Sequence, residues 1–597
     1  MKEKISAAIL IFFFFFVAFW QVIAKNKPIV LKVVTPTRLQ IDLNGNNVFD
    51  EGEMVCVNGV ESFSANLSQY SPKLSDELDF SYEDAISFGY LADEFAGNLL
   101  SGKRVKVNFT GEVHPDCRVA DVYLGDLNYA DTLYDAGFGI RKNNLFNRDA
   151  FQKNKQKASK LKLVILNHKS NKYHTLSCKY GQAAHDAVVL KESELPKNSI
   201  PCKFCHLTPF DKKQLQTHKE IVPPPNVITD GNMKLILTDF TRILKPDRSC
   251  SHQVCREFVN LIDGASESVD IALYGWADIP RVTRALDNAV SRGVKVRVVY
   301  DVSNSKAEYY PETKKFVSKY QDARSDKIEG SSKLTNMLMH DKFAVFDAKK
   351  VYTGSMNFST TGLSGFNHNN VVVINSIPVA KLYLNEFNQM FDGKFHTLKT
   401  PSENNLNIPS ASGQISVYFS PQDKGIIKGV VPIVKASKKY IYIPTFILTH
   451  ESLANALVDA KKRGVDVRVI VDATSAGTIH SKVKFLKSAG IPVKVENYAG
   501  KMHAKSMIID DQYVVLGSAN FSKSGEDKND ENLLIIKNYK FAKLYRDYFL
   551  YFWKKIPDKY LKYTLSAESK YSIGSCSDGI DNDFDGKIDF ADEGCKK

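Results

Sequence analysis

One pattern of residues, His-x-Lys-x4-Asp, occurs twice in the second half of the chain. The two copies consist of His340, Lys342 and Asp347, and of His503, Lys505 and Asp510. A histidine beside a cation suits phosphoryl chemistry, because an imidazole can attack phosphorus while an ammonium group offsets the charge of the phosphate. Two histidines that flank one phosphate allow a two-step displacement: one ring attacks phosphorus, and the other protonates the leaving oxygen and then activates water. The pattern therefore predicts phosphodiester chemistry that needs no metal ion.

The motif stands in an apolar run that is typical of a β-strand, where residues two apart point to the same face. Each histidine therefore shares a face with its lysine. The aspartate follows the histidine at an odd offset and points away from it if the strand continues. We expect Asp347 and Asp510 to complete the catalytic motif through structural hydrogen bonds rather than through chemistry.

A second repeated motif, Gly-Ser-x-Asn-Phe-Ser, follows each copy and supplies neutral donors. Its phosphate-binding candidates are Ser355, Asn357, Ser518 and Asn520. Farther upstream, residues 292–298 and 463–469 both read Arg-Gly-Val-x-Val-Arg-Val, and each follows a helix-like run. A helix that leads into a buried apolar strand indicates an α/β unit with a largely parallel sheet. This internal repeat predicts two α/β halves, related by a pseudo-twofold, that meet around one phosphate.

With both motifs intact, residues 226–560 resemble the phospholipase D superfamily. The resemblance implies two α/β halves at one active site and a covalent phosphohistidine intermediate. In members with two motifs the first histidine is usually the nucleophile, which implies that His340 attacks and that His503 is the general acid. The family often places an acidic residue after the Asn motif to orient a histidine of the opposite half. Glu531 matches that position, whereas the first copy has Asn369, and this asymmetry favours His340 as the nucleophile.

The N-terminal region, residues 28–142, alternates apolar and polar residues in short strand-like runs. A helical pattern over 83–100 separates them. The order of strands, helix and strands resembles a staphylococcal nuclease-like domain, through the stretches 84–90, 102–107 and 116–124. The resemblance implies a small OB-like β-barrel.

This domain departs from the nuclease family at its catalytic positions. Arg118 matches one family arginine, but the stretch that should begin with the other reads Cys56-Val-Asn-Gly-Val-Glu61. The downstream catalytic glutamate has no clear counterpart. We interpret the domain as degenerate, a binding or structural module rather than a nuclease. The resemblance also implies that Cys56 and Cys117 face one another across the vacated site.

The chain has nine cysteines, an odd number. The simplest assignment places six cysteines in three disulfides and leaves three cysteines as thiolate ligands of a metal ion. The disulfides are then the locally close pairs Cys250–Cys255 and Cys576–Cys595 and the remaining pair Cys56–Cys117. The metal ligands would be His174, Cys178, Cys202 and Cys205. Three thiolates and one imidazole suit tetrahedral zinc, and the alternative is a redox or structural Cys202–Cys205 disulfide.

Two acidic stretches carry oxygen donors at the spacing of a calcium loop. In the tail, residues 574–597, the donors are Asp581, Asp583, Asp585, Asp589 and Asp592. In the weaker loop at 42–53, which lacks the usual glycine, they are Asp42, Asn44, Asn46, Asp50 and Glu53. In both stretches the alternative is an acidic, hydrogen-bonded turn.

The 597 residues are 43% hydrophobic and 25% charged, ordinary globular values that argue against disorder, collagen and multi-span membrane architecture. The formal net charge of +13 favours a polyanionic partner, nucleic acid or anionic lipid, unless it only serves solubility. Lys2 and Lys4 precede an apolar run that ends near Ala24. This pattern predicts a signal peptide or N-terminal membrane anchor, and therefore an extracytoplasmic, periplasmic or secreted protein.

These patterns together predict a multidomain α/β protein. Its parts are a signal or anchor (1–24), a nuclease-like β-barrel (28–142), a Cys/His zinc-type module (143–210), a linker (211–228), a first phospholipase D-like half (229–397), a linker (398–413), a second half (414–560) and a calcium-type tail loop (574–597). A lysine run at 153–162 is either a phosphate-backbone footprint or a solvated helix face.

The motifs predict the reaction but not its substrate. An endonuclease acting on DNA or RNA is favoured by the net positive charge, the nuclease-like domain and the lysine run. The stretch 526–532 also resembles small bacterial endonucleases of the superfamily. The alternative is a phospholipase D that hydrolyses phosphatidylcholine-type lipids, because the N-terminal segment places the enzyme near membranes. A third possibility is a non-catalytic nucleic-acid-binding or uptake scaffold. We expect no cofactor for catalysis, structural zinc and calcium, and a monomer sufficient for one active site.

Overall fold

The computed structural model describes most of residues 28–596. The positions within that range that it does not describe are Asp79, 142–144, Ser177, His185, 203–204, 207–220, Asp278, 303–309, Gln321, 328–336 and Ala411. The predicted signal or anchor, 1–24, and much of the predicted linker at 211–228 lie outside the described residues. The chain divides into two compact units, Met1–Cys202 and Lys203–Lys597. No described helix combines the length and the apolar character that a membrane span requires.

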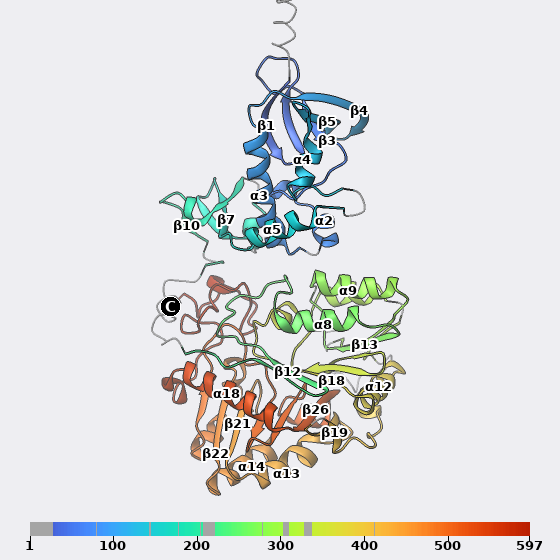
Figure 1. Cartoon of the computed structure of the whole chain (residues 1–597). Helices are drawn as coiled ribbons and strands as arrows, with labels where there is room; N and C mark the ends of the chain where they lie inside the picture. The colour runs from blue at the N-terminus through green and yellow to red at the C-terminus, as the bar shows by residue number, and fades with distance from the viewer. Residues whose placement is uncertain are drawn as a thin grey trace, which may run out of the picture. The chain divides into compact units, whose positions relative to one another are not determined.

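Unit 1 contains a six-stranded sheet in the order β1-β2-β3-β5-β4, with β6 paired to β5 (Figure 1). The strands are β1 (Ile29–Thr35), β2 (Arg38–Asp42), β3 (Met54–Val57), β4 (Lys106–His114), β5 (Cys117–Leu124) and β6 (Leu127–Asn128). The short helices are α2 (Pro72–Glu77) and α4 (Tyr129–Asp135). The helix predicted over 83–100 is confirmed as α3 (Tyr82–Leu100), which Ser81 caps and which buries Phe88 and Ala92 in the core of this unit.

The strand ladder of this sheet is open. Only an isolated bridge between Ile29 and Arg104, with neighbouring backbone hydrogen bonds, joins β1 to the segment before β4. A closed barrel is therefore not shown among the described residues. The staphylococcal nuclease-like identity of this domain stays a prediction.

A smaller sheet follows in unit 1, in the order β10-β8-β7-β9. Its elements are β7 (Leu163–Asn167), β8 (Lys172–Thr175), β9 (Ala187–Lys191), β10 (Ile200–Pro201) and the short helix α6 (Lys179–Gln182). Helix α5 (Arg148–Ala158) precedes it and carries much of the predicted lysine run. Lys153 and Lys157 are exposed on α5, and Lys155 lies over the ring of Phe80, 4.3 Å from its centroid. Exposed lysines fit both a solvated helix face and a phosphate-backbone footprint, so the footprint stays a prediction.

Unit 2 consists of two eight-stranded sheets with the same strand order, as the internal repeat predicts. The first runs β11-β12-β18-β17-β16-β13-β14-β15, with strands β11 (Val227–Asp230), β12 (Met233–Leu237), β13 (Ser268–Leu273), β14 (Lys295–Tyr300), β15 (Ala323–Ser325), β16 (Lys342–Phe346), β17 (Lys350–Gly354) and β18 (Asn370–Asn375). The second runs β19-β20-β26-β25-β24-β21-β22-β23, with strands β19 (Ile408–Ser410), β20 (Gly413–Ser420), β21 (Tyr440–Thr445), β22 (Asp466–Val471), β23 (Val493–Val495), β24 (Met507–Ile509), β25 (Tyr513–Gly517) and β26 (Glu531–Lys537).

The expectation of largely parallel sheets is wrong. Only β13–β14 and β14–β15 pair in parallel in the first sheet, and only β21–β22 and β22–β23 in the second. In both halves the repeated stretch does form a helix followed by a strand, as we expected. The catalytic motifs, however, open hairpins that add antiparallel strands to the same sheets, such as β16 against β13. Each half is therefore a mixed α/β sheet.

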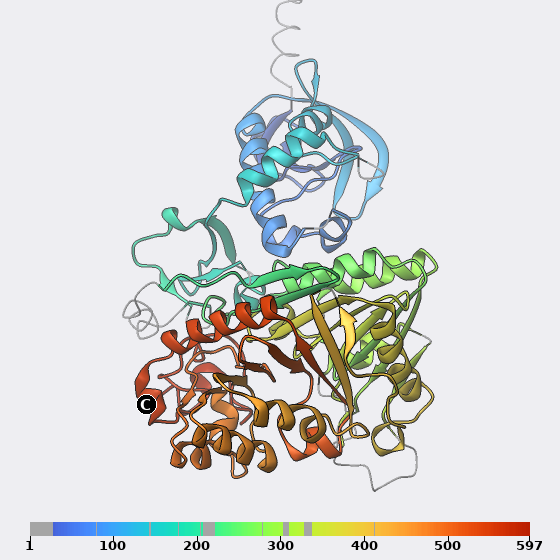
Figure 2. The same cartoon turned by 60° about the horizontal axis from the view of Figure 1, so that its bottom comes forward.

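Helices cover these sheets on both faces (Figures 1 and 2). Helices α8 (Gln253–Asp263) and α9 (Pro280–Ser291) share one core with the first sheet, and α13 (Val431–Ala436) and α14 (Glu451–Lys462) share another with the second. A third core takes side chains from both sheets and from α12 (Ile377–Phe391) and α18 (Tyr539–Lys555). Because both faces of each sheet are buried, the strands are apolar throughout rather than alternating. The shared core holds the two halves together.

The remaining helices of unit 2 are short. They are α10 (Glu312–Val317), α11 (Thr360–Leu363), α15 (Ala473–Ala476), α16 (Val483–Ser488) and α17 (Lys523–Asp527). Three disulfides are present and confirm the predicted pairings: Cys56–Cys117, Cys250–Cys255 and Cys576–Cys595.

Candidate active site

The two catalytic motifs meet across the junction of the halves. The backbone N–H of His340 donates to the carbonyl of Asp530 at 2.9 Å, and the N–H of His368 donates to the carbonyl of Lys501 at 2.8 Å. Isolated parallel bridges, Met339 to Asp530 and His368 to Met502, accompany these bonds. The backbone at the start of each catalytic motif therefore pairs with the opposite half, at Asp530 for the first motif and at His368 for the second. The same backbone pairing thus occurs in both directions across the junction, as the predicted pseudo-twofold relation requires.

Each catalytic histidine has a side-chain partner from the opposite half. His340 Nδ1 lies 2.8 Å from both carboxylate oxygens of Glu531. His503 Nδ1 lies 3.0 Å from Asn369 Oδ1. Both contacts are those that the sequence predicts. They leave Nε2 of each ring as the atom that can reach a substrate, because each Nδ1 is already bonded.

The two lysines are buried beside the histidines. Lys342 Nζ donates to the carbonyl of His340 at 2.5 Å, and Lys505 Nζ donates to that of His503 at 2.6 Å. Burial lowers the pKa of Lys342 to about 8. Burial and the charge of Lys342 hold the pKa of Lys505 well below its ordinary value. An anion bound between the lysines would restore their full charge, so the site is suited to a phosphate.

An aromatic ring lies against each histidine and lysine pair. The ring centroid of Tyr274 is 4.9 Å from that of His340, and the centroid of Phe446 is 5.2 Å from that of His503. Each ring directly follows a central strand, β13 or β21. The aromatic walls exclude water on one side of each imidazole, and this exclusion strengthens the electrostatic interactions inside the site.

The charges of the four motif side chains act on one another. Burial, with Lys342 and Lys505, holds the pKa of His340 well below its ordinary value. Burial, with Lys505, Lys342 and His340, does the same to the pKa of His503. The charge of each lysine therefore acts on both histidines. A neutral His340 has a lone pair on Nε2, which is the form a nucleophile requires.

Glu531 and His340 form a coupled pair. Glu531 is fully buried, and burial raises the pKa of its carboxyl to about 8 against the opposing charge of Lys342. When Nδ1–H donates to the Glu531 carboxylate, Nε2 keeps its lone pair, and Lys342 and Lys505 offset the negative charge of the carboxylate. When Nε2 attacks phosphorus, the ring becomes cationic, and Glu531 is already in place to stabilise that charge. Asn369 offers His503 no such charge.

The serines of the Gly-Ser-x-Asn motif do not act as predicted. Ser355 Oγ donates to Asn369 Oδ1 at 3.0 Å, and Ser518 bonds to Glu531 and accepts the backbone N–H of Asn532 at 2.9 Å. Both serines are fully buried. Their hydroxyls orient the partners of the two histidines, so their role is positioning rather than phosphate binding.

The asparagines of the same motif are placed differently. Asn357 Nδ2 lies 3.3 Å from the hydroxyl of Tyr310, and the side-chain oxygens of Asn357 and Asn520 have no hydrogen-bond partner in the described structure. Both residues are only partly buried. Phosphate contact by Asn357 and Asn520 stays a prediction.

Asp347 and Asp510 make the structural hydrogen bonds that we expected. Asp347 accepts the backbone N–H groups of Ser266, Glu267 and Ser268, and Asp510 accepts those of Lys438, Lys439 and Tyr440. Each aspartate stands in the left-handed turn that ends the motif strand, with φ of 50° and 56°. They tie that turn to the start of the central strand of the same half.

Two further aspartates position the motifs, and the sequence reasoning missed their role. Asp301 accepts the N–H of Met339 at 2.8 Å, and Asp472 accepts that of Met502 at 2.9 Å. Each holds the residue that immediately precedes a catalytic histidine. The sequence does point to a shared role, because both aspartates end the repeated stretch that begins with Arg-Gly-Val, at the same position.

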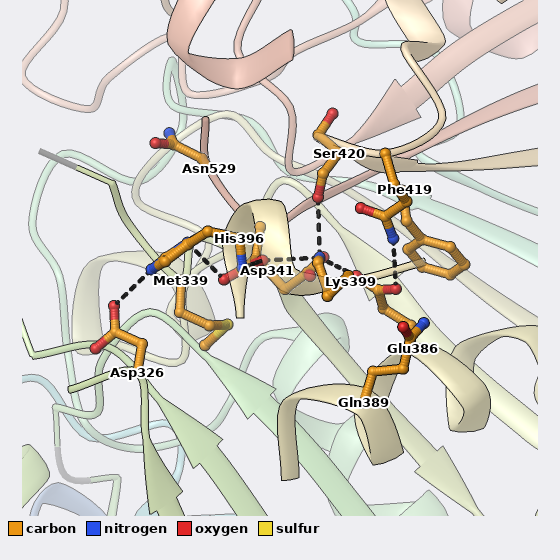
Figure 3. A network of polar contacts seen from close by, with 12 residues as sticks. Asp326, Met339, Asp341, Glu386, Gln389, His396, Lys399, Phe419, Ser420 and Asn529 are labelled. Carbon is orange, nitrogen blue, oxygen red and sulfur yellow. Dashed lines mark hydrogen bonds and ion pairs between the residues drawn. The ribbon is translucent and has the colours of Figure 1, made fainter. Parts of the chain in front are cut away.

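A buried ionic network lies behind the site (Figure 3). Lys399 pairs with Glu386 and, at 2.8 Å, with Asp530, and Asp530 pairs in turn with His396 Nδ1 at 2.9 Å. His396 Nε2 also lies 3.6 Å from Asp326. All five side chains are buried. Asp530 directly precedes Glu531, so the network anchors the backbone from which Glu531 reaches His340.

Some of the predicted metal ligands lie close together in the structure. One ligand atom from each of His174, Cys178, Cys202 and Cys205 lies within 4.8 Å of the others. In the tail, Asp583 gathers with Asp585 and Asp592, and also with Asp581 and Glu568, which the sequence analysis did not include.

The remaining calcium-loop residues are engaged in turns. Asp589 accepts the N–H of Gly579, Asp42 accepts those of Gly45 and Asn47, and Glu53 accepts those of Leu43 and Asp50. The amides of Asn44 and Asn46 donate to Asp50. The acidic, hydrogen-bonded turn accounts for the contacts at 42–53. Calcium at either loop stays a prediction.

Comparison with known proteins agrees with this geometry. The family model "Cardiolipin synthase, PLD-like domain" matches residues 258–391 and 430–553. A phospholipase D of Rickettsia prowazekii is 30% identical over 160 residues, 27% of this chain and 78% of that protein. The mitochondrial cardiolipin hydrolase of Homo sapiens is 27% identical over 157 residues, 26% of this chain and 61% of that protein.

A solved structure is also similar to part of the chain. The phospholipase D family member NUC from Salmonella typhimurium is 30% identical, with 24% of this chain and 95% of that chain covered and a TM-score of 0.23. The paired His-x-Lys motifs define a phosphodiester hydrolase. The chain belongs to the phospholipase D superfamily.

The Glu531 contact predicts a specific catalytic defect. Glu531→Gln keeps the shape of the side chain but removes the charge that stabilises a cationic His340. We expect kcat on a simple diester such as bis(p-nitrophenyl) phosphate to fall by roughly 10²- to 10⁴-fold. The exposed Glu451→Gln serves as the matched control and should leave kcat unchanged. A Glu531→Gln enzyme with wild-type kcat would contradict the assigned role.

The ionic network predicts a stability defect. Lys399→Met leaves Glu386 and Asp530 buried without their cation, which costs about 3–5 kcal/mol of unfolding free energy. Trp276 and Trp553 both lie in unit 2, so urea titration followed by tryptophan fluorescence reports on it. The control is Lys319→Met, which removes an exposed ion pair with Asp287. Equal urea midpoints for the two variants would refute the prediction.

Proposed function

We propose that this protein is an extracytoplasmic endonuclease that hydrolyses DNA or RNA through a phosphohistidine intermediate. The proposal rests on one observation beside the catalytic histidines. Lys501 precedes His503 by two residues, lowers its pKa, and lies 4.3 Å from the ring of Phe584, which is 54% exposed. Lys501 Nζ lies over the ring and also donates to Thr474 Oγ1 and to the carbonyl of Asn582. Its remaining N–H can contact phosphate, and the exposed part of Phe584 can stack on a base, so the pair suits a nucleotide chain.

In the first step, Nε2 of His340 attacks phosphorus and a P–N bond forms. The negative charge of the bound diester favours a protonated His503. The bond from phosphorus to the leaving oxygen breaks, and His503 gives its Nε2 proton to that oxygen. Lys342 and Lys505 balance the charge on the non-bridging oxygens. Glu531 stabilises the cationic ring of His340 through Nδ1.

In the second step, His503 is the general base. It takes a proton from a water molecule, whose oxygen attacks phosphorus as the P–N bond breaks. The products are a phosphate monoester and neutral His340. The proton on His503 then serves the next turnover, so the pair of histidines returns to its starting state. One chain contains every group in this cycle, so a monomer suffices.

The charge of the chain and its disulfides support the rest of the proposal. A net charge of +13 attracts polyanions and favours their rapid association. Three disulfides are typical of proteins that work in an oxidising compartment. This agrees with the extracytoplasmic location that the N-terminal residues predict.

A phospholipase D is the second candidate. It is favoured by the similarity to proteins named phospholipase D and mitochondrial cardiolipin hydrolase. Phe584 also fits this alternative, because an exposed aromatic ring beside a lysine can contact a lipid surface. Both candidates share the two-step chemistry, so only the substrate separates them.

A side-by-side substrate assay decides between them. Wild-type protein is incubated with plasmid DNA, single-stranded DNA, RNA, and vesicles of phosphatidylcholine or cardiolipin. We expect cleavage of nucleic acid and none of lipid. His340→Ala should abolish the activity, and the exposed His480→Ala should not. Release of a lipid headgroup with intact nucleic acid would overturn the nuclease proposal in favour of a phospholipase, and binding of DNA without cleavage of any substrate would indicate a scaffold.

A further inference from the structure

We propose that His174, Cys178, Cys202 and Cys205 bind one structural zinc ion. One ligand atom from each residue lies within 4.8 Å of the other three, and all four side chains are buried. None of the three cysteines is in a disulfide, although the chain forms three disulfides elsewhere. Unit 1 ends at Cys202, and Cys205 follows only three positions later, so the four ligands belong to one local stretch of chain.

The small sheet brings the four ligands together. His174 lies on β8, and β10 pairs in parallel with β8, with Pro201 opposite Tyr173. Cys202 directly follows β10, and its N–H donates to the carbonyl of Tyr173 at 2.9 Å. The strand register therefore places Cys202 next to His174.

The turn after β8 brings in the next ligand. The N–H of Cys178 donates to the carbonyl of Thr175 at 3.1 Å, and the Sγ of Cys178 lies 3.3 Å from His174 Nδ1. Gly181 of α6 packs directly on His174, since a Cβ at that position would lie 2.8 Å from the histidine Cβ. The absence of a side chain there lets the short helix close over the ligand.

The chemistry of the four donors selects zinc. Three thiolates and one imidazole form the tetrahedral set of structural zinc sites, and soft sulfur donors exclude calcium and magnesium. Four protein ligands leave no open position for a substrate, so the ion is structural rather than catalytic.

The module needs such a cross-link. Its own buried apolar residues in the small core are Leu163, Ile165, Leu176 and Val189, which pack with Ala65 and Ile86 of the neighbouring domain. So small a core stabilises a fold weakly, and natural modules of this size are held by metals or disulfides. A zinc ion would fix the segment after β10 to the β8 hairpin.

The test is the metal content of the full-length protein, purified without chelator and measured by inductively coupled plasma mass spectrometry. We expect about one zinc per chain. His174→Ala should lower the stoichiometry to near zero, whereas His168→Ala, an exposed histidine between β7 and β8, should keep one zinc. Cobalt in place of zinc should give the visible absorption of a tetrahedral cobalt thiolate site.

A second measurement keeps the proposal testable if His174→Ala does not fold. Folded wild-type protein is alkylated with and without a strong chelator, and the modified cysteines are mapped. We expect Cys178, Cys202 and Cys205 to react fully only when the chelator is present. A metal-free protein with a Cys202–Cys205 disulfide would overturn the proposal, as would iron in place of zinc. Neither result bears on the phosphodiesterase proposal, because the readouts are metal and thiol content.

Discussion

The active site depends on one constraint: the catalytic histidines and lysines are buried, and groups from the opposite half must compensate for their lost solvation. His340 is 8% exposed and Lys342 is 1% exposed, so neither is well solvated. Glu531 supplies the compensating carboxylate across the junction, and Asn369 supplies the matching contact to His503. The shared core between the two sheets is what keeps these cross-half contacts at hydrogen-bonding distance. Neither half has a complete site by itself.

The fold is nearly symmetric, but the chemistry is not. Both halves use the same strand order, an aspartate that holds the residue before the motif histidine, and an aromatic ring against that histidine, Tyr274 in one half and Phe446 in the other. The difference lies in one pair of residues, the carboxylate of Glu531 and the amide of Asn369. The ionic network centred on Lys399 and Asp530 adds to that asymmetry, because it anchors the segment that carries Glu531. A duplicated scaffold thus assigns different tasks to two equivalent imidazoles.

Much of the site could be predicted from the sequence, because repeated spacing reveals residues that share one role. The histidines, the lysines and the hydrogen-bonding role of Asp347 and Asp510 follow from the two motifs, and the partners Glu531 and Asn369 follow from the resemblance to the phospholipase D superfamily. Strand direction could not be predicted, since a helix followed by an apolar strand looks the same in a parallel and in a mixed sheet.

Other features were missed because they depend on long-range packing. The inward hydroxyl of Ser355 is committed to Asn369, and no local pattern distinguishes such a serine from one that faces a ligand. Lys399 and Glu386 come together only through tertiary structure, and a lone buried lysine has no signature in the sequence. Repetition in both halves identifies the catalytic groups, but it does not reveal what the repeated aspartates Asp301 and Asp472 hold or that the repeated serines face the histidine partners.

The most direct test of this account is to identify the histidine that becomes covalently modified. Wild-type enzyme turning over a diester substrate is stopped rapidly with denaturant, digested and mapped by mass spectrometry. The account predicts a phosphoryl adduct on the peptide that contains His340. An adduct on His503 would contradict the assignment of Glu531 as the partner of the nucleophile, and the absence of any adduct during turnover would contradict the covalent mechanism itself.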